Sequence, residues 1–193
     1  MIFENVINEL NLRTTLIGTL ICLAMACAGP AKEEKDVEQT PEDRLEQQKM
    51  RRSLLFALIA DSRIESLSEY IVANDMSAMF STDPGPFLFF TPTNEAFEGL
   101  DPATLKLWSN KNNGIVKSLI NKHLTRVDTL VADLSYYEGR NLQTLGGIQI
   151  KVIRDQDQFY LEDVKGKRAL ITTNPMQMDN GYIFYIDQLL HRP

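Results

Sequence analysis

Cysteine is nearly absent from this sequence, and its two copies, Cys22 and Cys27, both lie close to the N-terminus. The rest of the chain therefore has no disulfide, no thiolate metal site and no cysteine nucleophile. Residues 42–193 must instead be stabilised by a hydrophobic core, which a segment of this length can readily form.

Histidine and catalytic motifs are scarce as well. The two histidines are His123 and His191, and the sequence has no Gly-x-Ser-x-Gly elbow and no phosphate-binding glycine loop. Because His123 follows Leu119 by four residues, it lies on the apolar face of a predicted helix. There a histidine bonded to the backbone is a simpler interpretation than a catalytic base. A hydrolase that pairs His123 with a carboxylate and a hydroxyl is the alternative. We predict no enzymatic activity and no cofactor.

The acidic residues do not form a complete ligand set for a metal. Asp155-x-Asp157 and Glu162-Asp163 could gather a calcium ion at a hairpin tip. However, the glycine and the closing glutamate of a calcium-binding loop are missing. We therefore predict no metal site.

The sequence also lacks an excess of basic side chains. The formal net charge is -6, and residues 42–193 carry 17 basic and 20 acidic side chains. A weakly acidic domain without a basic stripe is poorly suited to bind a phosphate backbone. Nucleic acid is therefore not expected as a partner.

No hydrophobic run is long enough to span a bilayer. Residues 14–26 form an uncharged, mostly apolar run of 13 residues, which is typical of a signal-peptide core. The run ends in Leu23-Ala-Met-Ala-Cys27, which resembles a bacterial lipobox. This resemblance implies a signal peptide over residues 1–27 and a lipid anchor on Cys27 as the partner of the membrane. A signal sequence or signal anchor without lipid is the alternative.

Residues 28–41 are polar and charged, with almost no large apolar side chain. Such a composition predicts a disordered tether between the anchor and a domain over residues 42–193. Lys32–Asp36 resembles the charged signals of Bacteroidetes-type surface lipoproteins, although charge that only solvates a linker would give the same composition. The expected location is the cell envelope, as an outer-membrane lipoprotein that this segment could carry to the surface.

What the domain does contain is a clear change of structural type between residues 87 and 100. Phe87–Phe90 is a wholly apolar run between proline-rich breakers, which predicts a strand buried on both faces. Thr93 or Asn94 then offers a capping oxygen for a short helix. Phe97 follows at helical spacing, so this helix is expected to fold back over the strand.

Helix signals dominate the first half of the domain. Thr40–Asp43 predicts a helix start, and an apolar face runs from Leu45 on to Ile59. A second helix is expected to begin at Ser62 and to stop at Asn74–Asp75.

The second half shows strand signals. After Leu142 the apolar residues recur with period two over Ile148–Val152 and Phe159–Leu161. Asn180–Gly181 predicts a tight turn before the apolar run over residues 182–186. Helices followed by antiparallel strands indicate the α+β fold class.

Four segments in order resemble the fasciclin-like domain family. They are Phe89–Leu100, Leu119–His123, Leu142–Val152 and Asn180–Leu190, with Lys122 at the place of the family's tyrosine. The residues that match its pattern, and to which it gives structural roles, are Thr93, Asn94, Phe97, His123, Gly147, Asn180, Gly181 and Asp187.

The resemblance implies a wedge of two small β-sheets with a layer of α-helices on one side, and a non-catalytic adhesion or binding module. Asp187 is interpreted as pairing with backbone amides. Asn174–Met178 replaces an acidic stretch that animal relatives use for adhesion, so animal-type receptor binding is not carried over.

Candidate contact residues are Tyr136 and Tyr137, which lie outside any apolar periodicity. Adjacent exposed tyrosines would suit contacts with protein or glycan, and a lid over the helix layer is the alternative. The methionines at 76, 79, 176 and 178 are interpreted as core residues rather than as a partner groove.

The expected partner is another envelope protein or an extracellular glycan. One alternative function is a glycan-binding accessory of an outer-membrane nutrient-uptake system, in which the two tyrosines and Trp108 would form an exposed aromatic shelf. A structural protein tied to peptidoglycan is another.

Overall fold

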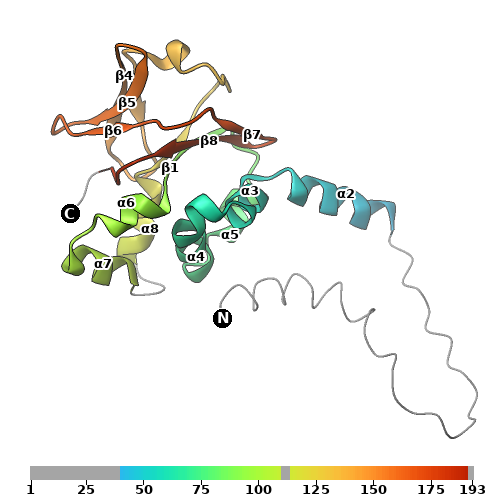
Figure 1. Cartoon of the computed structure of the whole chain (residues 1–193). Helices are drawn as coiled ribbons and strands as arrows, with labels where there is room; N and C mark the ends of the chain where they lie inside the picture. Colours follow the sequence, from blue (N-terminus) through green and yellow to red (C-terminus); the bar gives the residue numbers. More distant parts are fainter. Residues whose placement is uncertain (1–39, 110–113, 191–193) are drawn as a thin grey trace, which may run out of the picture. The chain divides into compact units, whose positions relative to one another are not determined.

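The computed structural model describes residues 40–109 and 114–190 (Figure 1). The predicted signal peptide with Cys27, nearly all of the predicted tether and His191 lie outside these ranges. The chain divides into two compact units, Met1–Arg44 and Leu45–Pro193. Within the described ranges, no helix is both long and apolar enough to cross a membrane.

The helices precede most of the strands, as the sequence predicts. In chain order they are α2 Pro41–Arg51, α3 Leu54–Ala60, α4 Glu65–Ala73, α5 Ser77–Ser81, α6 Asn94–Glu98, α7 Pro102–Ser109 and α8 Gly114–Asn121, with the 3-10 turns η1 Ser62–Ile64 and η2 Leu134–Tyr137. The predicted start at Thr40 is confirmed, because its hydroxyl oxygen accepts a bond from the Asp43 N–H at 3.1 Å. The Asp43 carboxylate in turn accepts from the Thr40 N–H at 3.0 Å, which completes a reciprocal cap.

The continuous apolar face expected from Leu45 to Ile59 is wrong. Helix α2 ends at Arg51, and Leu45 is 52% exposed. Ser53 is the N-cap of α3, where its hydroxyl oxygen accepts the Phe56 N–H at 3.4 Å. A serine before an apolar run favours a new helix start, and this signal overrides the apparent continuity of the apolar pattern.

Sheet A has the strand order β2-β1-β8-β7. Its strands are β1 Phe87–Pro92, β2 Leu124–Arg126, β7 Met176–Met178 and β8 Gly181–Ile186. The two central strands, β1 and β8, run parallel, whereas the outer pairs are antiparallel. Every residue of β1 and β8 is buried, which confirms the prediction that the Phe87–Phe90 strand is covered on both faces.

Sheet B is fully antiparallel, with the order β3-β4-β5-β6. Its strands are β3 Asn141–Gln143, β4 Gln149–Asp155, β5 Gln158–Asp163 and β6 Arg168–Leu170. The period-two pattern is confirmed, since Ile150, Val152 and Leu161 are buried between more exposed neighbours. The sheets meet through isolated bridges, Thr125 with Thr144 and Ile171 with Ile186.

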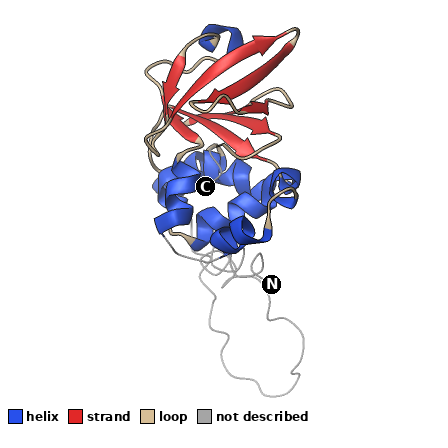
Figure 2. Ribbon diagram, turned by 90° about the vertical axis from the view of Figure 1, so that its left-hand side faces the viewer, coloured by secondary structure: helices blue, strands red, loops and turns tan. Residues whose placement is uncertain are grey.

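Sheet A is the middle layer of residues 45–193, with a hydrophobic core on each face. Phe87 and Phe89 of β1 pack with the helices, whereas Leu88 and Phe90 pack with the inner face of sheet B. The α-helices gather on one side of the two sheets, whereas the short η2 turn lies at the opposite end (Figure 2). The expected α+β arrangement of two small sheets with helices on one side is therefore confirmed.

Candidate functional site

Asn180 connects sheet A to the helices. Its side-chain oxygen accepts the Leu54 N–H at 2.9 Å and so caps α3, and its side-chain nitrogen donates to the carbonyl oxygens of Phe80 (3.1 Å) and Asp83 (3.2 Å). Its backbone oxygen accepts the Phe87 N–H at 3.0 Å. One buried side chain thus fixes three segments that lie about 100 positions or more away in the sequence.

The tight turn predicted at Asn180–Gly181 is shifted by one residue. Met178 pairs with Gly181 across the turn, so the turn residues are Asp179 and Asn180, and Gly181 begins β8. A Cβ atom on Gly181 would collide with the Phe87 carbonyl oxygen. Glycine therefore serves the close parallel approach of β8 to β1 rather than a left-handed turn conformation.

His123 is a fully buried core residue, as predicted. Its Nδ1 lies 2.8 Å from the Leu119 carbonyl oxygen, and its Nε2 accepts the Leu190 N–H at 3.0 Å. This pattern requires the neutral tautomer with the proton on Nδ1. Burial lowers the pKa of His123 to about 4. Both ring nitrogens are occupied by backbone groups, so His123 has no free position for base catalysis.

Two adjacent glycines, Gly146 and Gly147, lie in the hairpin after β3. Gly147 has a φ of 79°, a left-handed conformation that favours glycine. At Gly146, a Cβ atom would lie 2.6 Å from the Lys122 backbone nitrogen, and the Gly146 N–H donates to the Asn121 carbonyl oxygen at 2.8 Å. The absence of a side chain at Gly146 therefore lets the hairpin pack directly against the end of α8.

Asp187 stabilises the junction of the two sheets beside the Ile171–Ile186 bridge. Its carboxylate accepts the Leu170 N–H at 2.8 Å, and its own N–H donates to the Leu170 carbonyl oxygen at 3.2 Å. The side chain therefore pairs with a backbone amide, as predicted, and satisfies the edge of β6.

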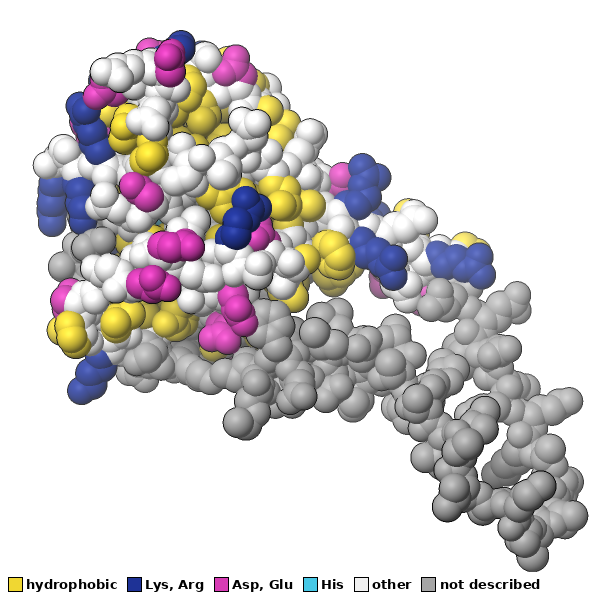
Figure 3. Space-filling model, in the orientation of Figure 1, with side chains coloured by type: hydrophobic (Ala, Val, Ile, Leu, Met, Phe, Trp, Pro, Cys, Tyr) yellow, Lys and Arg dark blue, Asp and Glu magenta, His cyan; other side chains and the backbone are white. Residues whose placement is uncertain are grey.

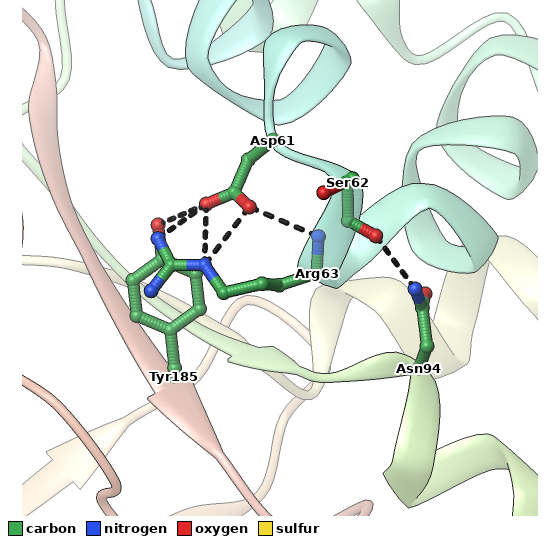
Figure 4. Close-up of polar contacts among 5 residues, drawn as sticks. All are labelled: Asp61, Ser62, Arg63, Asn94 and Tyr185. Atoms are coloured by element: carbon green, nitrogen blue, oxygen red, sulfur yellow. Dashed lines mark hydrogen bonds and ion pairs between the residues drawn. The ribbon is translucent and has the colours of Figure 1, made fainter.

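A polar cluster that the sequence analysis missed joins η1 to β8 (Figure 4). The Tyr185 hydroxyl donates to the Asp61 carboxylate at 2.6 Å, and the Arg63 guanidinium binds the same carboxylate at 2.6–3.2 Å. The guanidinium also stacks 4.1 Å above the Tyr185 ring. Hydrogen bonding to Arg63 lowers the pKa of Asp61 to about 2, whereas burial and Asp61 raise the pKa of Tyr185.

Asn94 belongs to the same region but does not cap its own helix. Thr93 is the N-cap of α6 and makes no side-chain cap, so the predicted capping oxygen is wrong for both residues. The Asn94 oxygen instead accepts the Ser66 N–H at 3.1 Å, and its nitrogen donates to the Ser62 carbonyl oxygen at 2.7 Å (Figure 4). Asn94 thereby caps α4, which has no side-chain cap of its own. Phe97 is buried in the helix-side core.

The two candidate contact tyrosines have different environments. Tyr137 is buried, and its hydroxyl accepts the Val131 N–H at 3.1 Å and donates to the Thr129 carbonyl oxygen at 3.2 Å. The prediction of two exposed tyrosines is therefore wrong for Tyr137, which pins the loop after β2 to the core between the sheets. Sequence pattern could not separate the two because their roles depend on the η2 turn.

Tyr136 is the exposed member of the pair, at 41%. Its ring meets the Tyr137 ring edge-on, with centroids 4.9 Å apart, and the Arg140 guanidinium stacks 4.0 Å above it. The surrounding backbone is fixed, because the Gly139 N–H donates to the Val152 carbonyl oxygen at 2.8 Å. The turn therefore presents an aromatic and a cationic group on a rigid support.

Trp108 does not contribute to this surface. It is fully buried and packs against Tyr70 and Phe97, with ring centroids 5.1 Å apart in both cases. The aromatic shelf expected for a glycan-binding accessory is thus absent from the described residues. The four methionines interpreted as core residues, Met76, Met79, Met176 and Met178, all pack in or against the helix-side core.

The acidic residues at the hairpin tips have other partners. Asp155 and Glu162 pair with Arg168 at 3.5 and 2.9 Å, and Asp157 pairs with Arg154 at 3.5 Å. No group of three or more metal-ligating side chains occurs among residues 40–109 and 114–190. These carboxylates therefore serve as ion pairs on sheet B.

Comparison with known proteins identifies the family. The model of the fasciclin domain matches residues 62–192. Periostin from Homo sapiens is 26% identical over 140 residues, which cover 72% of this chain and 16% of periostin. Transforming growth factor-beta-induced protein ig-h3 from Sus scrofa is 27% identical over 134 residues, which cover 67% of this chain and 18% of that protein. This chain thus spans less than a fifth of the length of these relatives.

A solved structure shows the same fold. It contains a FAS1 domain pair from the insect cell adhesion molecule fasciclin I. The TM-score is 0.61 at 17% sequence identity, and the match covers 72% of this chain and 51% of that one.

Proposed function

Because this chain belongs to the fasciclin domain family, we propose that it is a non-catalytic adhesion module that binds another protein at the cell envelope. The solved relative belongs to a cell adhesion molecule, which supports a role in contact. The observation that carries the proposal is the rigid turn that exposes Tyr136 beside Arg140. Tyrosine and arginine on a preorganised support are frequent centres of protein–protein interfaces.

The absence of catalysis is supported by how the polar groups are used. Both nitrogens of His123 bind backbone groups, and the Tyr185 hydroxyl is committed to Asp61. Each group is a structural link between segments distant in the sequence. Neither supplies the free base or the activated nucleophile that hydrolysis needs.

A protein partner is favoured over a glycan. Sugar rings bind with their apolar C–H faces on open aromatic faces, but one face of Tyr136 is stacked against Arg140, and Trp108 is buried. The Tyr136–Arg140 pair offers an aromatic edge and a guanidinium fork, which match an apolar group next to a carboxylate.

The proposed anchor is a lipid on Cys27, followed by a polar tether over residues 28–41. Acyl chains would hold the chain at the membrane, and the tether would give the domain reach. Metabolic labelling with a clickable fatty acid is expected to label the wild type and to leave Cys27→Ala unlabelled. Equal labelling, or none in either protein, would contradict the anchor.

The contact site is tested by photo-cross-linking in intact envelopes. A photoreactive amino acid at position 136 is expected to form a specific adduct with a protein. The same residue at position 164, which is also exposed but lies on the turn between β5 and β6, should give none. Arg140→Gln should reduce the adduct at position 136. Identical adducts at both positions would overturn the proposed contact site, and binding on a glycan array that depends on Tyr136 would overturn the choice of a protein partner.

A further inference from the structure

The end of α2 carries a dense basic segment. Lys49, Arg51 and Arg52 are all exposed, and Glu46 is the single acid within residues 45–52. Residues 53–193, by contrast, carry 13 basic and 17 acidic side chains. Charge is therefore distributed unequally: the last turn of α2 is net positive, whereas the first turn of α2 carries Glu42 and Asp43 and residues 53–193 are net negative.

Two of these cations differ from Arg168, the first residue of β6. Arg168 lies 2.9 and 3.5 Å from two carboxylates. No ion pair involves Lys49 or Arg51 among residues 40–109 and 114–190, and Arg52 forms an exposed pair with Asp179 at 2.8 Å. The charges at positions 49 and 51 are thus available for an external anion.

An exposed aromatic residue follows the basic segment directly. Phe56 is 45% exposed on α3, although Leu55 and Ala57 on either side of it are buried. Lys and Arg side chains gather over α2, next to exposed hydrophobic side chains (Figure 3). A favourable interaction with the C-terminal end of the helix dipole would account for Lys49 and Arg51 but leaves the exposure of Phe56 unexplained.

We propose that the basal patch, defined as Lys49, Arg51, Arg52 and Phe56, docks on the anionic phospholipid surface that holds the chain. Its four members combine cations with an apolar side chain, as membrane-surface segments do. The net negative charge of residues 53–193 disfavours contact of the rest of the domain with the same surface. The inference rests on the proposed membrane anchoring.

The test uses a fluorescent reporter at the patch, introduced by Phe56→Trp. The full-length variant, purified from the producing cells with its N-terminus as processed there, is reconstituted on vesicles. The vesicles contain either phosphatidylcholine alone or phosphatidylcholine with roughly 30% phosphatidylglycerol, which gives the surface the negative charge of an anionic leaflet. Because Trp108 is fully buried, its emission is a constant background. The emission of the introduced indole is expected to shift to the blue and to be quenched by spin-labelled lipid on the anionic vesicles only.

Charge variants make the test specific. Lys49→Gln with Arg51→Gln removes two cations and leaves the Arg52 ion pair intact. Each basic side chain near an anionic surface strengthens binding by about fivefold, so the ratio of docked to undocked domains should fall by about thirtyfold. The matched control, Lys117→Gln with Lys151→Gln, removes the same charge from exposed positions on α8 and β4 and should leave the reporter unchanged.

Failure of the patch and failure of the anchor give different results. If the anchor is wrong, the protein stays in solution with phosphatidylcholine vesicles. If the anchor is right and the patch is wrong, the protein sediments with both vesicle types, and the emission of the introduced indole is independent of lipid charge. An equal loss in both charge variants would also overturn the proposal, because it would indicate a general charge effect.

Discussion

The imidazole of His123 accepts a hydrogen bond from the backbone N–H of Leu190 and so ties the segment after α8 to the segment after β8. Only the neutral ring can accept this bond, and burial lowers the pKa of His123 to about 4. In the unfolded chain the pKa is the ordinary 6.5, so the unfolded state binds the proton first as the pH falls.

The free energy of unfolding should therefore fall between pH 6.5 and pH 4, by about 3 kcal/mol from the shift in the His123 pKa. Urea denaturation at a series of pH values measures this slope. His123→Gln is expected to be less stable at pH 7 and to lose the slope. His191→Gln is the matched control and should keep it; a slope that disappears in this control instead would refute the assignment.

Asn180→Ala should be among the most damaging polar substitutions in the domain. It removes the bond to the Leu54 N–H at the start of α3 and the bonds to the carbonyl oxygens of Phe80 and Asp83, all in a buried position. We expect a loss of about 2–4 kcal/mol in the free energy of unfolding. Asn141→Ala, at an exposed position of β3, should change it by less than about 0.5 kcal/mol in urea denaturation. Similar losses in the two variants would argue against the linking role of Asn180.

The adjacent glycines of the hairpin after β3 can be tested by a paired substitution. Gly146→Ala places a Cβ atom 2.6 Å from the Lys122 backbone nitrogen, so the hairpin must move away from α8. A destabilisation of about 1–3 kcal/mol is expected. Gly99→Ala meets no atom within 4 Å at a φ of -79°, and should be neutral or stabilising by up to about 1 kcal/mol. Thermal unfolding of both variants measures the difference, and a neutral Gly146→Ala would contradict the close packing.

The Asp61–Tyr185 pair is suited to a double-mutant cycle. Asp61→Ala and Tyr185→Phe each remove the 2.6 Å bond, so their effects should not add, with a coupling of about 0.5–3 kcal/mol at pH 7. The pKa of Asp61 lies below its ordinary value of 3.8, at about 2. The coupling should therefore be complete above pH 3.8 and decline as the pH falls toward 2. Additive effects at pH 7 would show that the bond contributes nothing to stability.

Substitutions of the two neighbouring tyrosines should have opposite effects on stability and on cross-linking. Tyr137→Phe removes the hydroxyl that bonds Val131 and Thr129, and should lower the free energy of unfolding by about 1 kcal/mol. Tyr136→Ala exchanges an exposed side chain, so stability should change little while envelope cross-linking is lost. Calorimetry on both variants separates the structural residue from the contact residue. A marked loss of stability in Tyr136→Ala would place it in the framework instead.

Sequence patterns located the buried layers because burial and local periodicity coincide there. Phe87–Phe90, the period-two strands of sheet B and His123 were all recognisable from their neighbours in the chain. Contacts between residues far apart in the sequence were not recognisable in this way. The contact of Tyr185 with Asp61 has no local pattern, since the two residues meet only when β8 reaches η1. The sequence did not distinguish the exposed Tyr136 from the buried Tyr137 for a similar reason. A short 3-10 turn decides which of the two rings faces the core.

The parallel pairing of β1 with β8 has a consequence for biosynthesis. The two strands are separated by about ninety residues, yet each supplies side chains to both cores. Neither core can close before β8 has been made, so the domain cannot complete its fold until its most C-terminal strand is synthesised.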